Sequence, residues 1–433
     1  MSLKQIRVNY VARVEGEASL DVKVQDGRVE ELYLDVYEPP RFFQGFLVGR
    51  KFDEVADTVS RICGICPVSH QLTSLLALEN AMGVKVSQQT RDLRKLLALA
   101  QWIQSHTLHV YMLAAPDFLG YESVLAMADD HLPVVQRALR LKKLGNDLTD
   151  LIGGRAVHPI TCVVGGFTKV PSREQLNAIR DRLAQAKEEM LTTVELVAGL
   201  PLPEFTRECE HVALSQPDQY AVNEGRLVST RGLEITAGEY RRYIKEKQVP
   251  WSHALHSYIV GRDSFMVGPL ARVNLNFDKL SPDARRAAEK TGIRFPNFNP
   301  FVSALARAIE LVHCVDECVE IIDRLDPHDE EFSVEIRPGE GAAITEAPRG
   351  VLYHSYKVNA QGIVEKADIV SPTAHNVNNI EKDLREFVPK VADLPEEEAT
   401  LKCEMAIRNY DPCFSCSAHF LRMKIRHEDA GRP

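Results

Sequence analysis

Residues 61–70 read RICGICPVSH and place Cys63 and Cys66 three positions apart, followed by a proline and a histidine. A second pair with the same spacing, Cys413 and Cys416, lies in YDPCFSCSAH near the other end of the chain. Four thiolates are enough for a tetrahedral sulfur site, which Zn²⁺ or an iron–sulfur cluster usually occupies. A fold that joins the two pairs would therefore be built around a buried sulfur site.

The composition narrows the class of protein. The 433 residues are 45% hydrophobic and 26% charged, with a net charge of -9 and nine cysteines. No apolar run approaches the roughly 20 residues of a membrane span, and the acidic balance argues against a nucleic-acid binder. The N-terminus alternates polar and apolar residues and shows no signal peptide, so we expect a cytoplasmic protein. In a reducing compartment, CxxC pairs indicate metal or redox sites before a disulfide framework.

Hydropathy patterns predict a mainly α-helical protein with small antiparallel β-sheets, an α+β fold with a body of long helices. Strand-like alternation covers 6–37, around a turn at Asp26–Gly27. A hairpin is predicted over 350–370, turning near 360–362. Residues 201–300 are rich in Pro, Gly and aromatics and have mixed periodicity, so we assign no element there.

Three long helices are predicted from apolar residues at helical spacing. They cover 91–116, a segment from a capping box at Ser172 and Gln175 to a stop at Gly199, and 302–325. No repeat or linker interrupts the chain, which predicts one integrated domain over 1–433.

Within this domain we expect four parts. They are a β-rich part at 1–50, the helical body at 51–330, a β-containing part at 331–400, and the C-terminal cysteine motif and tail at 401–433.

The residues by themselves leave the occupant of the sulfur site open. A structural zinc scaffold with closed coordination is one interpretation. Zinc knuckles, however, usually bring both pairs from one small module, whereas these pairs are far apart and flanked by Ile62, Ile65 and Phe414. A soft, buried thiolate set also suits a redox-active metal such as nickel.

The two cysteine motifs resemble the signatures of the large, catalytic subunit of nickel–iron hydrogenases, in sequence, order and position. Further segments are similar to the family: RVEGEA at 13–18, RFFQGFLVGR at 41–50, APDF at 115–118 and EAPRG at 346–350. The chain length and the EPPRFF and YDPCFSCSAH variants resemble the cytoplasmic, multimeric class linked to NAD(P). The resemblance implies reversible heterolytic cleavage and formation of H₂ at a buried nickel–iron centre.

The resemblance also implies the ligands. Cys63 and Cys413 would be terminal ligands of nickel, and Cys66 and Cys416 would bridge nickel to an iron that carries carbon monoxide and cyanide. Bridging thiolates leave an open position for H₂ between the metals. The released proton needs a base, and we rank the Cys413 thiolate before Arg349, because arginine is normally fixed in its charged form.

Other matched residues would surround the metals. Glu15 resembles the proton-relay glutamate of the family, although an ordinary strand carboxylate is the alternative. His70 resembles the histidine that hydrogen-bonds a bridging sulfur, or it is a buried structural histidine. Asp117 and Asp411 would hold the guanidinium of Arg349, and their alternative roles are in a helix cap and a turn.

Four more residues complete the predicted site. Pro348 belongs to the cofactor-binding set, and Thr373 would donate a hydrogen bond to an iron-bound cyanide unless it is simply a loop threonine. His419 and Gln44 would bind Mg²⁺, but the family commonly has a glutamate in place of Gln44, and an amide is the poorer ligand for a hard cation. The family is often cleaved after the histidine that matches His419, whereas here FLRMKIRHEDAGRP follows.

The sequence also predicts partners. It contains no nucleotide-binding loop and no ferredoxin-like cysteine string, so electrons must leave through another chain. The resemblance implies a small subunit with iron–sulfur clusters, with diaphorase-type flavin and iron–sulfur subunits passing electrons to NAD(P) or ferredoxin. Besides the zinc scaffold, the rival is a relative of the quinone-pocket subunit of respiratory complex I, which usually lacks these cysteine pairs.

Overall fold

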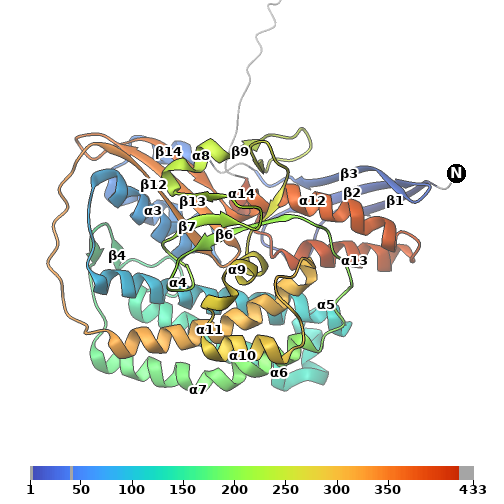
Figure 1. Cartoon of the computed structure of the whole chain (residues 1–433), viewed down its shortest axis with the longest axis horizontal. Helices are drawn as coiled ribbons and strands as arrows, with labels where there is room; N and C mark the ends of the chain where they lie inside the picture. Colours follow the sequence, from blue (N-terminus) through green and yellow to red (C-terminus); the bar gives the residue numbers. More distant parts are fainter. Residues whose placement is uncertain (1–2, 40–41, 419–433) are drawn as a thin grey trace, which may run out of the picture.

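The computed structural model describes residues 3–39 and 42–418. Long helices form a bundle along one side, and small sheets lie along the other (Figure 1). The bundle consists of α4 (Gln88–Leu108), α6 (Val124–Gly153), α7 (Arg173–Ala198) and α11 (Ser303–Arg324). The prediction of a mainly helical fold with small sheets is confirmed.

The capping residues decide where the long helices begin. Ser172 accepts a hydrogen bond from the Gln175 N–H (3.2 Å), and the Gln175 side chain accepts one from the Ser172 N–H (2.9 Å), so α7 starts where predicted. Ser87 accepts a hydrogen bond from the Thr90 N–H (3.0 Å) and caps α4, which moves its start to residue 88. Helix α6 was not predicted, because Pro133 and a non-helical His131 interrupt its apolar pattern.

An antiparallel sheet forms the N-terminal part, in the order β1 (Leu3–Val8), β2 (Ala18–Gln25) and β3 (Arg28–Val36). The predicted turn at Asp26 and Gly27 is present, with both residues in the left-handed region. Two helices pack on this sheet, α12 (Pro372–Val391) on β3 and α13 (Glu396–Asn409) on β1. The last long helices are therefore brought back to the first strands.

A second antiparallel sheet contains β12 (Gly339–Ala347), β13 (Gly350–Val358) and β14 (Val364–Val370). The predicted hairpin corresponds to β13 and β14. Helix α3 (Pro67–Met82) packs on β12 and β13. The tight turn between β12 and β13 leaves only residues 348 and 349 outside the two strands.

Shorter elements complete the chain, and several lie in the unassigned stretch 201–300. The strands are β4 (Cys162–Val163), β5 (Gly166–Phe167), β6 (Glu210–Ser215), β7 (Arg226–Ser229), β8 (Glu234–Ile235), β9 (Ile244–Lys247), β10 (His256–Ile259) and β11 (Phe265–Met266). The short α-helices are α1 (Phe43–Leu47), α2 (Phe52–Ser60), α5 (Ala115–Leu119), α8 (Tyr240–Tyr243), α9 (Pro269–Asn276), α10 (Pro282–Lys290) and α14 (Phe414–Ser417). A π-helix, η1 (His109–Ala114), follows α4, and 3₁₀ turns are η2 (Ala237–Glu239), η3 (Phe277–Lys279) and η4 (Pro300–Val302). Strands of two to six residues are too short to show a period, and β11 pairs with β6 in parallel, unlike the predicted antiparallel sheets.

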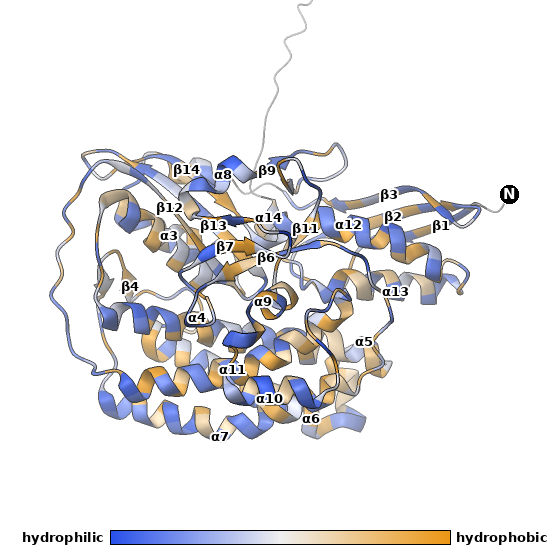
Figure 2. Cartoon of the chain, in the orientation of Figure 1, coloured by the Kyte–Doolittle hydropathy of each residue, from blue (hydrophilic) through white to orange (hydrophobic). Residues whose placement is uncertain are grey.

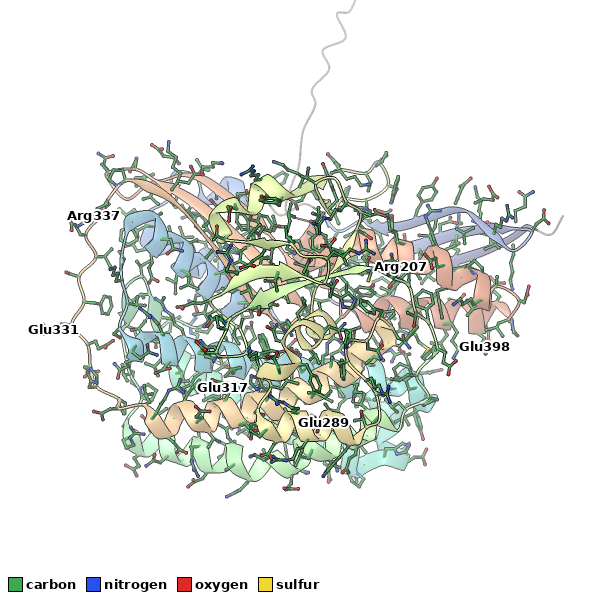
Figure 3. All side chains as sticks on the ribbon, in the orientation of Figure 1. Arg207, Glu289, Glu317, Glu331, Arg337 and Glu398 are labelled. Atoms are coloured by element: carbon green, nitrogen blue, oxygen red, sulfur yellow. A yellow bond between two sulfur atoms is a disulfide. The ribbon has the colours of Figure 1, made fainter. Side chains whose placement is uncertain are left out.

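Hydrophobic and hydrophilic residues alternate along the helices and strands (Figure 2). The main core includes residues from both ends of the chain, such as Ile6 and Ile407. In contrast, 325–338 has no helix or strand and runs along the outside, where Glu331 and Arg337 are exposed (Figure 3). Within the described residues, no helix is both long and apolar enough to span a membrane.

Candidate metal centre

The cysteines of the two CxxC pairs lie together in the interior. Cys63 and Cys66 stand just before α3, and Cys413 and Cys416 flank and form part of α14. All four are buried, and their sulfurs lie within 4.8 Å of one another. The Sγ–Sγ distances are 3.5 Å for Cys63–Cys413 and 3.9 Å for Cys66–Cys416. The prediction that distant ends of the chain meet around four sulfurs is confirmed.

Main-chain hydrogen bonds join the N-terminal loop to the C-terminal motif. The Phe414 N–H donates to the Glu15 carbonyl (2.8 Å), and the Glu15 N–H donates to the Pro412 carbonyl (3.4 Å). A Cβ on Gly16 would lie 2.6 Å from the Ser415 nitrogen, and Gly16 has a φ of +87°. Because only glycine fits there without strain, Gly16 allows the segment RVEGEA to lie against the cysteine motif.

The side chain of Glu15 faces the sulfur of Cys413. Cys413 Sγ lies 2.8 Å from Glu15 Oε2, so that the thiol of the reduced cysteine would donate a hydrogen bond to this carboxylate. On the other side, the Cys413 N–H donates to Thr373 Oγ1 at 2.8 Å, in the first turn of α12. Cys413 is thus fixed by two neighbours, one of which is a carboxylate that can accept a proton from the sulfur.

In the N-terminal cysteine pair, the sulfur of Cys63 accepts two main-chain hydrogen bonds. The N–H groups of Ile65 and Cys66 each donate to Cys63 Sγ at 3.3 Å. A hydrogen bond from the Cys66 side chain lowers the pKa of Cys63 against the effect of burial, whereas the same bond and burial raise the pKa of Cys66. Cys413 and Cys416 form a disulfide in this structure, so binding of a metal by all four sulfurs requires that pair to be reduced.

A buried arginine completes the site. Arg349 lies in the turn between β12 and β13, and its Nη2 donates to Asp411 Oδ1 at 2.9 Å. Burial opposes the positive charge, but Asp411 and the thiols of Cys63 and Cys66 outweigh it and raise the pKa of Arg349. Its Nε and Nη1 atoms are buried without a hydrogen-bond partner in the described part of the chain. Such N–H groups beside four cysteine sulfurs fit a site that holds a further polar or anionic group.

Comparisons with known proteins bear on this site. Residues 41–136 and 236–419 match the family described as nickel-dependent hydrogenase. The sulfhydrogenase 1 subunit alpha of Pyrococcus furiosus is 36% identical over 426 residues, which cover 96% of this chain and 98% of the relative. The chain belongs to the nickel-dependent hydrogenase family. The sulfhydrogenase 2 subunit alpha of the same organism is 32% identical, with 96% of this chain and 100% of the relative covered.

Solved structures share the fold of this hydrogenase subunit. A chain of an NAD⁺-reducing NiFe-hydrogenase in the H₂-reduced state has a TM-score of 0.87 and 26% identity, covering 96% of this chain and 99% of that chain. A NiFeSe-hydrogenase of Dm. baculatum shares the fold, with a TM-score of 0.77, 23% identity, and 96% and 100% of the two chains covered. The predicted family and fold are confirmed, and the activity is H₂ cleavage at a nickel–iron site. Four buried cysteines, once all are reduced to thiolates, are a soft donor set that suits these metals.

The structure corrects the predicted partner of Asp117. Asp411 pairs with Arg349 as predicted, but the carboxylate of Asp117 accepts hydrogen bonds from Arg408 Nε (2.7 Å) and Nη2 (3.0 Å) and pairs with Arg13. No hydrogen bond of Asp117 goes to Arg349 in the described chain. The Asp117 carboxylate therefore links Arg13 of the RVEGEA segment to Arg408 of α13. This structural role depends on how the segments pack, and the APDF motif alone does not indicate it.

We expect Asp117→Asn to destabilise this hydrogenase subunit. The amide would remove the buried carboxylate charge that pairs with Arg408 and leave Glu404, 3.5 Å away, as its remaining counter-ion, a change that costs about 3–5 kcal/mol in the free energy of unfolding. Chemical unfolding of the purified subunit measures this loss, with the exposed Asp129→Asn as a control that shifts stability by less than ~0.5 kcal/mol. Equal stability of the two variants would contradict a structural role for Asp117.

The other predicted residues have defined places. His70 lies in the first turn of α3, with its Nδ1 3.2 Å from His354 Nε2, and His354 Nδ1 is 2.7 Å from the Tyr356 hydroxyl. Gln44 lies in α1 and donates from Nε2 to the Ile369 carbonyl at 3.2 Å. The hydrogen bond from His70 to a bridging sulfur stays a prediction.

The predicted magnesium site has two protein ligands, Gln44 and His419. His419, its second protein ligand, lies outside the described residues. Gln44 donates a hydrogen bond to the Ile369 main-chain carbonyl. A carbonyl oxygen is itself a possible ligand of Mg²⁺. The binding of Mg²⁺ therefore also stays a prediction.

One buried residue that shapes the site, Arg307, was not predicted. Arg307 of α11 donates to the carbonyls of Asn409 (3.1 Å) and Tyr410 (3.3 Å), and its Nε is 3.9 Å from Asp411 Oδ2. Burial lowers the pKa of Arg307 to about 10. The signal was present, since Arg307 is a charged residue in the predicted helix 302–325, and charges that become buried are usually paired.

Proposed function

We propose that this hydrogenase large subunit cleaves and forms H₂ reversibly and heterolytically, with its four clustered cysteines as the protein ligands of the metals. Cys63 and Cys413 would hold nickel as terminal ligands, and Cys66 and Cys416 would bridge nickel to iron. The pairing of sulfurs supports this division, because Cys63 lies beside Cys413 (3.5 Å) and Cys66 beside Cys416 (3.9 Å). When bound, the metals polarise H₂ and accept its two electrons, so that two protons remain for the protein to remove.

The contact between Cys413 and Glu15 is the observation that carries this proposal. The sulfur of Cys413 accepts the first proton, and the carboxylate of Glu15, 2.8 Å from that sulfur, takes it onward. In the reverse direction Glu15 returns a proton to the sulfur. A carboxylate at this distance is a suitable general acid and base because no rearrangement precedes the transfer.

Arg349 acts as a fixed positive charge in this proposal. Asp411 and the nearby thiols raise the pKa of Arg349, so its guanidinium keeps its proton and is a poor base. Its Nε and Nη1 atoms, which have no hydrogen-bond partner among the described residues, are free to donate to a negatively charged group on the metals. This role agrees with the prediction that the Cys413 thiolate is a better base than Arg349.

We further propose that carbon monoxide and cyanide complete the coordination of iron. Thr373 and Pro348 belong to the residues that surround these ligands. In support, the Thr373 hydroxyl is buried and already accepts the Cys413 N–H, which leaves its own O–H to donate to another group. An Mg²⁺ ion held by Gln44 and His419 remains a part of the proposal.

Electron transfer requires partner chains. In the described residues the four cysteines are the only cluster of three or more His, Cys, Asp or Glu suited to a metal ion. We propose a small subunit with iron–sulfur clusters, and diaphorase-type subunits that pass electrons to NAD(P) or ferredoxin. The solved NAD⁺-reducing hydrogenase of similar fold supports this class. A cytoplasmic location and one integrated domain over 1–433 are further parts of the proposal.

Metal analysis and infrared spectroscopy test this function. The subunit, matured together with its partners and separated from them for metal analysis, is expected to contain nickel and iron in equal amounts, and the complex is expected to show infrared bands of metal-bound carbon monoxide and cyanide. It is also expected to exchange H₂ with deuterated water. Zinc as the sole metal, with no such bands, would contradict the proposal and favour the zinc scaffold.

A further inference from the structure

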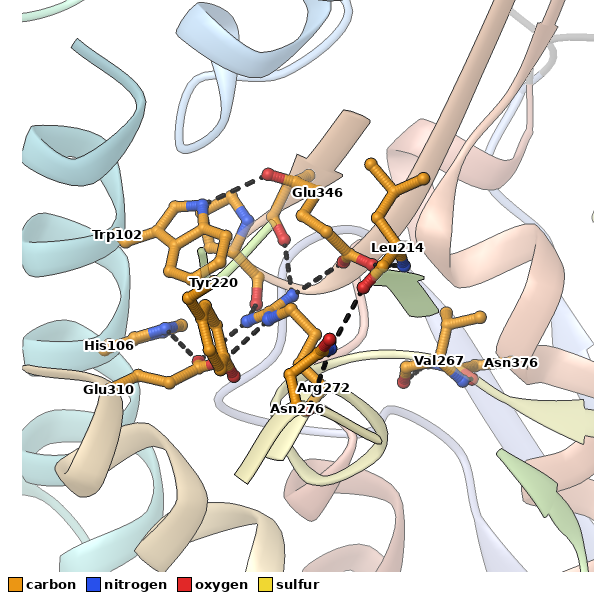
Figure 4. Close-up of polar contacts among 12 residues, drawn as sticks. Trp102, His106, Leu214, Tyr220, Val267, Arg272, Asn276, Glu310, Glu346 and Asn376 are labelled. Carbon is orange, nitrogen blue, oxygen red and sulfur yellow. Dashed lines mark hydrogen bonds and ion pairs between the residues drawn. The ribbon is translucent and has the colours of Figure 1, made fainter. Parts of the chain in front are cut away.

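A second cluster of buried charged side chains lies next to the turn that carries Arg349. At its centre is Arg272 of α9, between Glu310 of α11 and Glu346 of β12 (Figure 4). All three side chains are buried, with exposures of 0 to 1%. Nε and Nη2 of Arg272 donate to the two oxygens of Glu310 at 2.7 and 2.8 Å, and Nη1 donates to Glu346 Oε2 at 3.0 Å. None of these residues contacts the four cysteines in the hydrogen bonds described above.

The remaining donors of Arg272 hold the main chain next to Arg349. Nη1 donates to the Ala347 carbonyl at 2.9 Å, and Nη2 donates to the Pro348 carbonyl at 3.0 Å. A guanidinium has five N–H donors, and the five bonds of Arg272 use them all. Two of the five therefore fix the two peptide groups that immediately precede Arg349.

The surroundings leave this turn little freedom. Leu214 N–H donates to Glu346 Oε1 at 2.8 Å, and Trp102 Nε1 donates to the Glu346 carbonyl at 3.2 Å. On the other side, Gly350 has a φ of +130°, and a Cβ there would lie 2.6 Å from Val267 Cγ2. Arg349 thus lies between Glu346, which hydrogen bonds hold before the turn, and Gly350, which packs closely against Val267 after it.

Glu310 connects the cluster to the helix bundle. Besides Arg272, it contacts His106 Nε2 (2.8 Å) and accepts a hydrogen bond from the Tyr220 hydroxyl (2.7 Å). The guanidinium of Arg272 also lies over the Trp102 ring, 4.1 Å from its centroid. Helices α4, α9 and α11 therefore all contribute to the support of one turn.

Stability alone does not account for this arrangement. Replacing buried ion pairs by packed apolar residues is often neutral or stabilising, whereas a planar, five-donor fork defines direction and distance. We propose that Arg272 is a positioning residue for Arg349, holding the Ala347 and Pro348 carbonyls so that the Arg349 guanidinium stays beside the metal-binding sulfurs. This inference rests on the proposed function of the site.

The test compares Arg272→Lys with Arg94→Lys in the matured complex. Arg94 forms an equally buried, bidentate pair with Glu79 (2.7 and 2.6 Å) and also donates to a carbonyl, that of Val163, but none of these partners is a predicted site residue. A lysine keeps the positive charge of either site and loses the fork. The measurements are nickel and iron content, thermal unfolding, the infrared bands of metal-bound carbon monoxide and cyanide, and H₂ oxidation.

We expect both variants to lose stability, but only Arg272→Lys to change the site. Since a displacement of about 1 Å can cost ~10²-fold in rate, Arg272→Lys is expected to lower H₂ oxidation by that order and to shift the infrared bands, with metal content unchanged. Wild-type bands and rate in loaded Arg272→Lys would overturn the inference. So would an equal band shift and rate loss in Arg94→Lys.

A milder variant applies if Arg272→Lys does not fold. Glu346→Gln keeps the size of the side chain but places an amide against Arg272 and Leu214 N–H, both of which are donors. We expect shifted infrared bands in this variant, and unshifted bands would overturn the inference. Failure of the proposed function is distinguishable, because the unmodified complex would then lack the bands or the metals.

Discussion

Replacement of Glu15 by glutamine is expected to lower the rates of H₂ oxidation and of H₂ formation by about 10²- to 10⁴-fold, the usual contribution of a general acid or base. Glutamine keeps the length of the side chain and can still accept a hydrogen bond from the Cys413 thiol, but it cannot take the proton. Nickel and iron content and the infrared bands are expected to stay as in the unmodified complex. Steady-state rates with an artificial electron acceptor measure the loss.

The matched control for this experiment is Glu17→Gln. Glu17 lies two residues further along the same segment, is exposed, and contacts the Glu38 carboxylate through its main-chain N–H, which the substitution retains. The rate of the Glu17→Gln variant is expected to remain near that of the unmodified complex. A full rate in metal-loaded Glu15→Gln would exclude Glu15 as the acceptor of the proton from Cys413.

Replacement of Cys66 by serine is expected to remove the metal centre. A serine hydroxyl is a hard donor that stays protonated at neutral pH, whereas a bridge between nickel and iron needs a soft thiolate. Because even residues that only orient ligands change metal affinity or activity 10–100-fold, loss of a bridging ligand is expected to lower activity by more than about 10²-fold. Metal analysis of the purified protein should show less nickel and iron.

A buried cysteine outside the cluster provides the control. Cys403 of α13 is fully buried and does not belong to the group of four sulfurs, so Cys403→Ser should retain both metals. A Cys66→Ser variant that keeps nickel, iron and the infrared bands would show that Cys66 is not a ligand.

Much of the fold was predictable where local chemistry decides it. The turn at Asp26–Gly27 and the capping box at Ser172 and Gln175 depend only on residues close in sequence, and both are present. Helix α6 was missed because Pro133 lies inside it, and a proline normally ends a helix. Its long packing contacts with α4 and α7 stabilise it across that kink.

The candidate site also has features that the sequence predicted and features that only the structure shows. Side-chain types at fixed spacing, such as Cys63 with Cys66, indicated metal chemistry, because ligand softness is a property of the residue itself. The partner of Asp117 could not be predicted, since Arg13, Arg408 and Arg349 are all charge-compatible and only their positions in space select among them.

The amino-acid sequence by itself therefore determined the kind of donors, the family that they resemble, and the elements set by near neighbours. Only the tertiary structure decided which sulfurs face each other, that Glu15 contacts Cys413, and that Arg272 holds the turn before Arg349. The reason is physical: contacts between distant residues depend on how helices and sheets pack, and many pairings are chemically allowed. Packing leaves one of them within hydrogen-bonding distance.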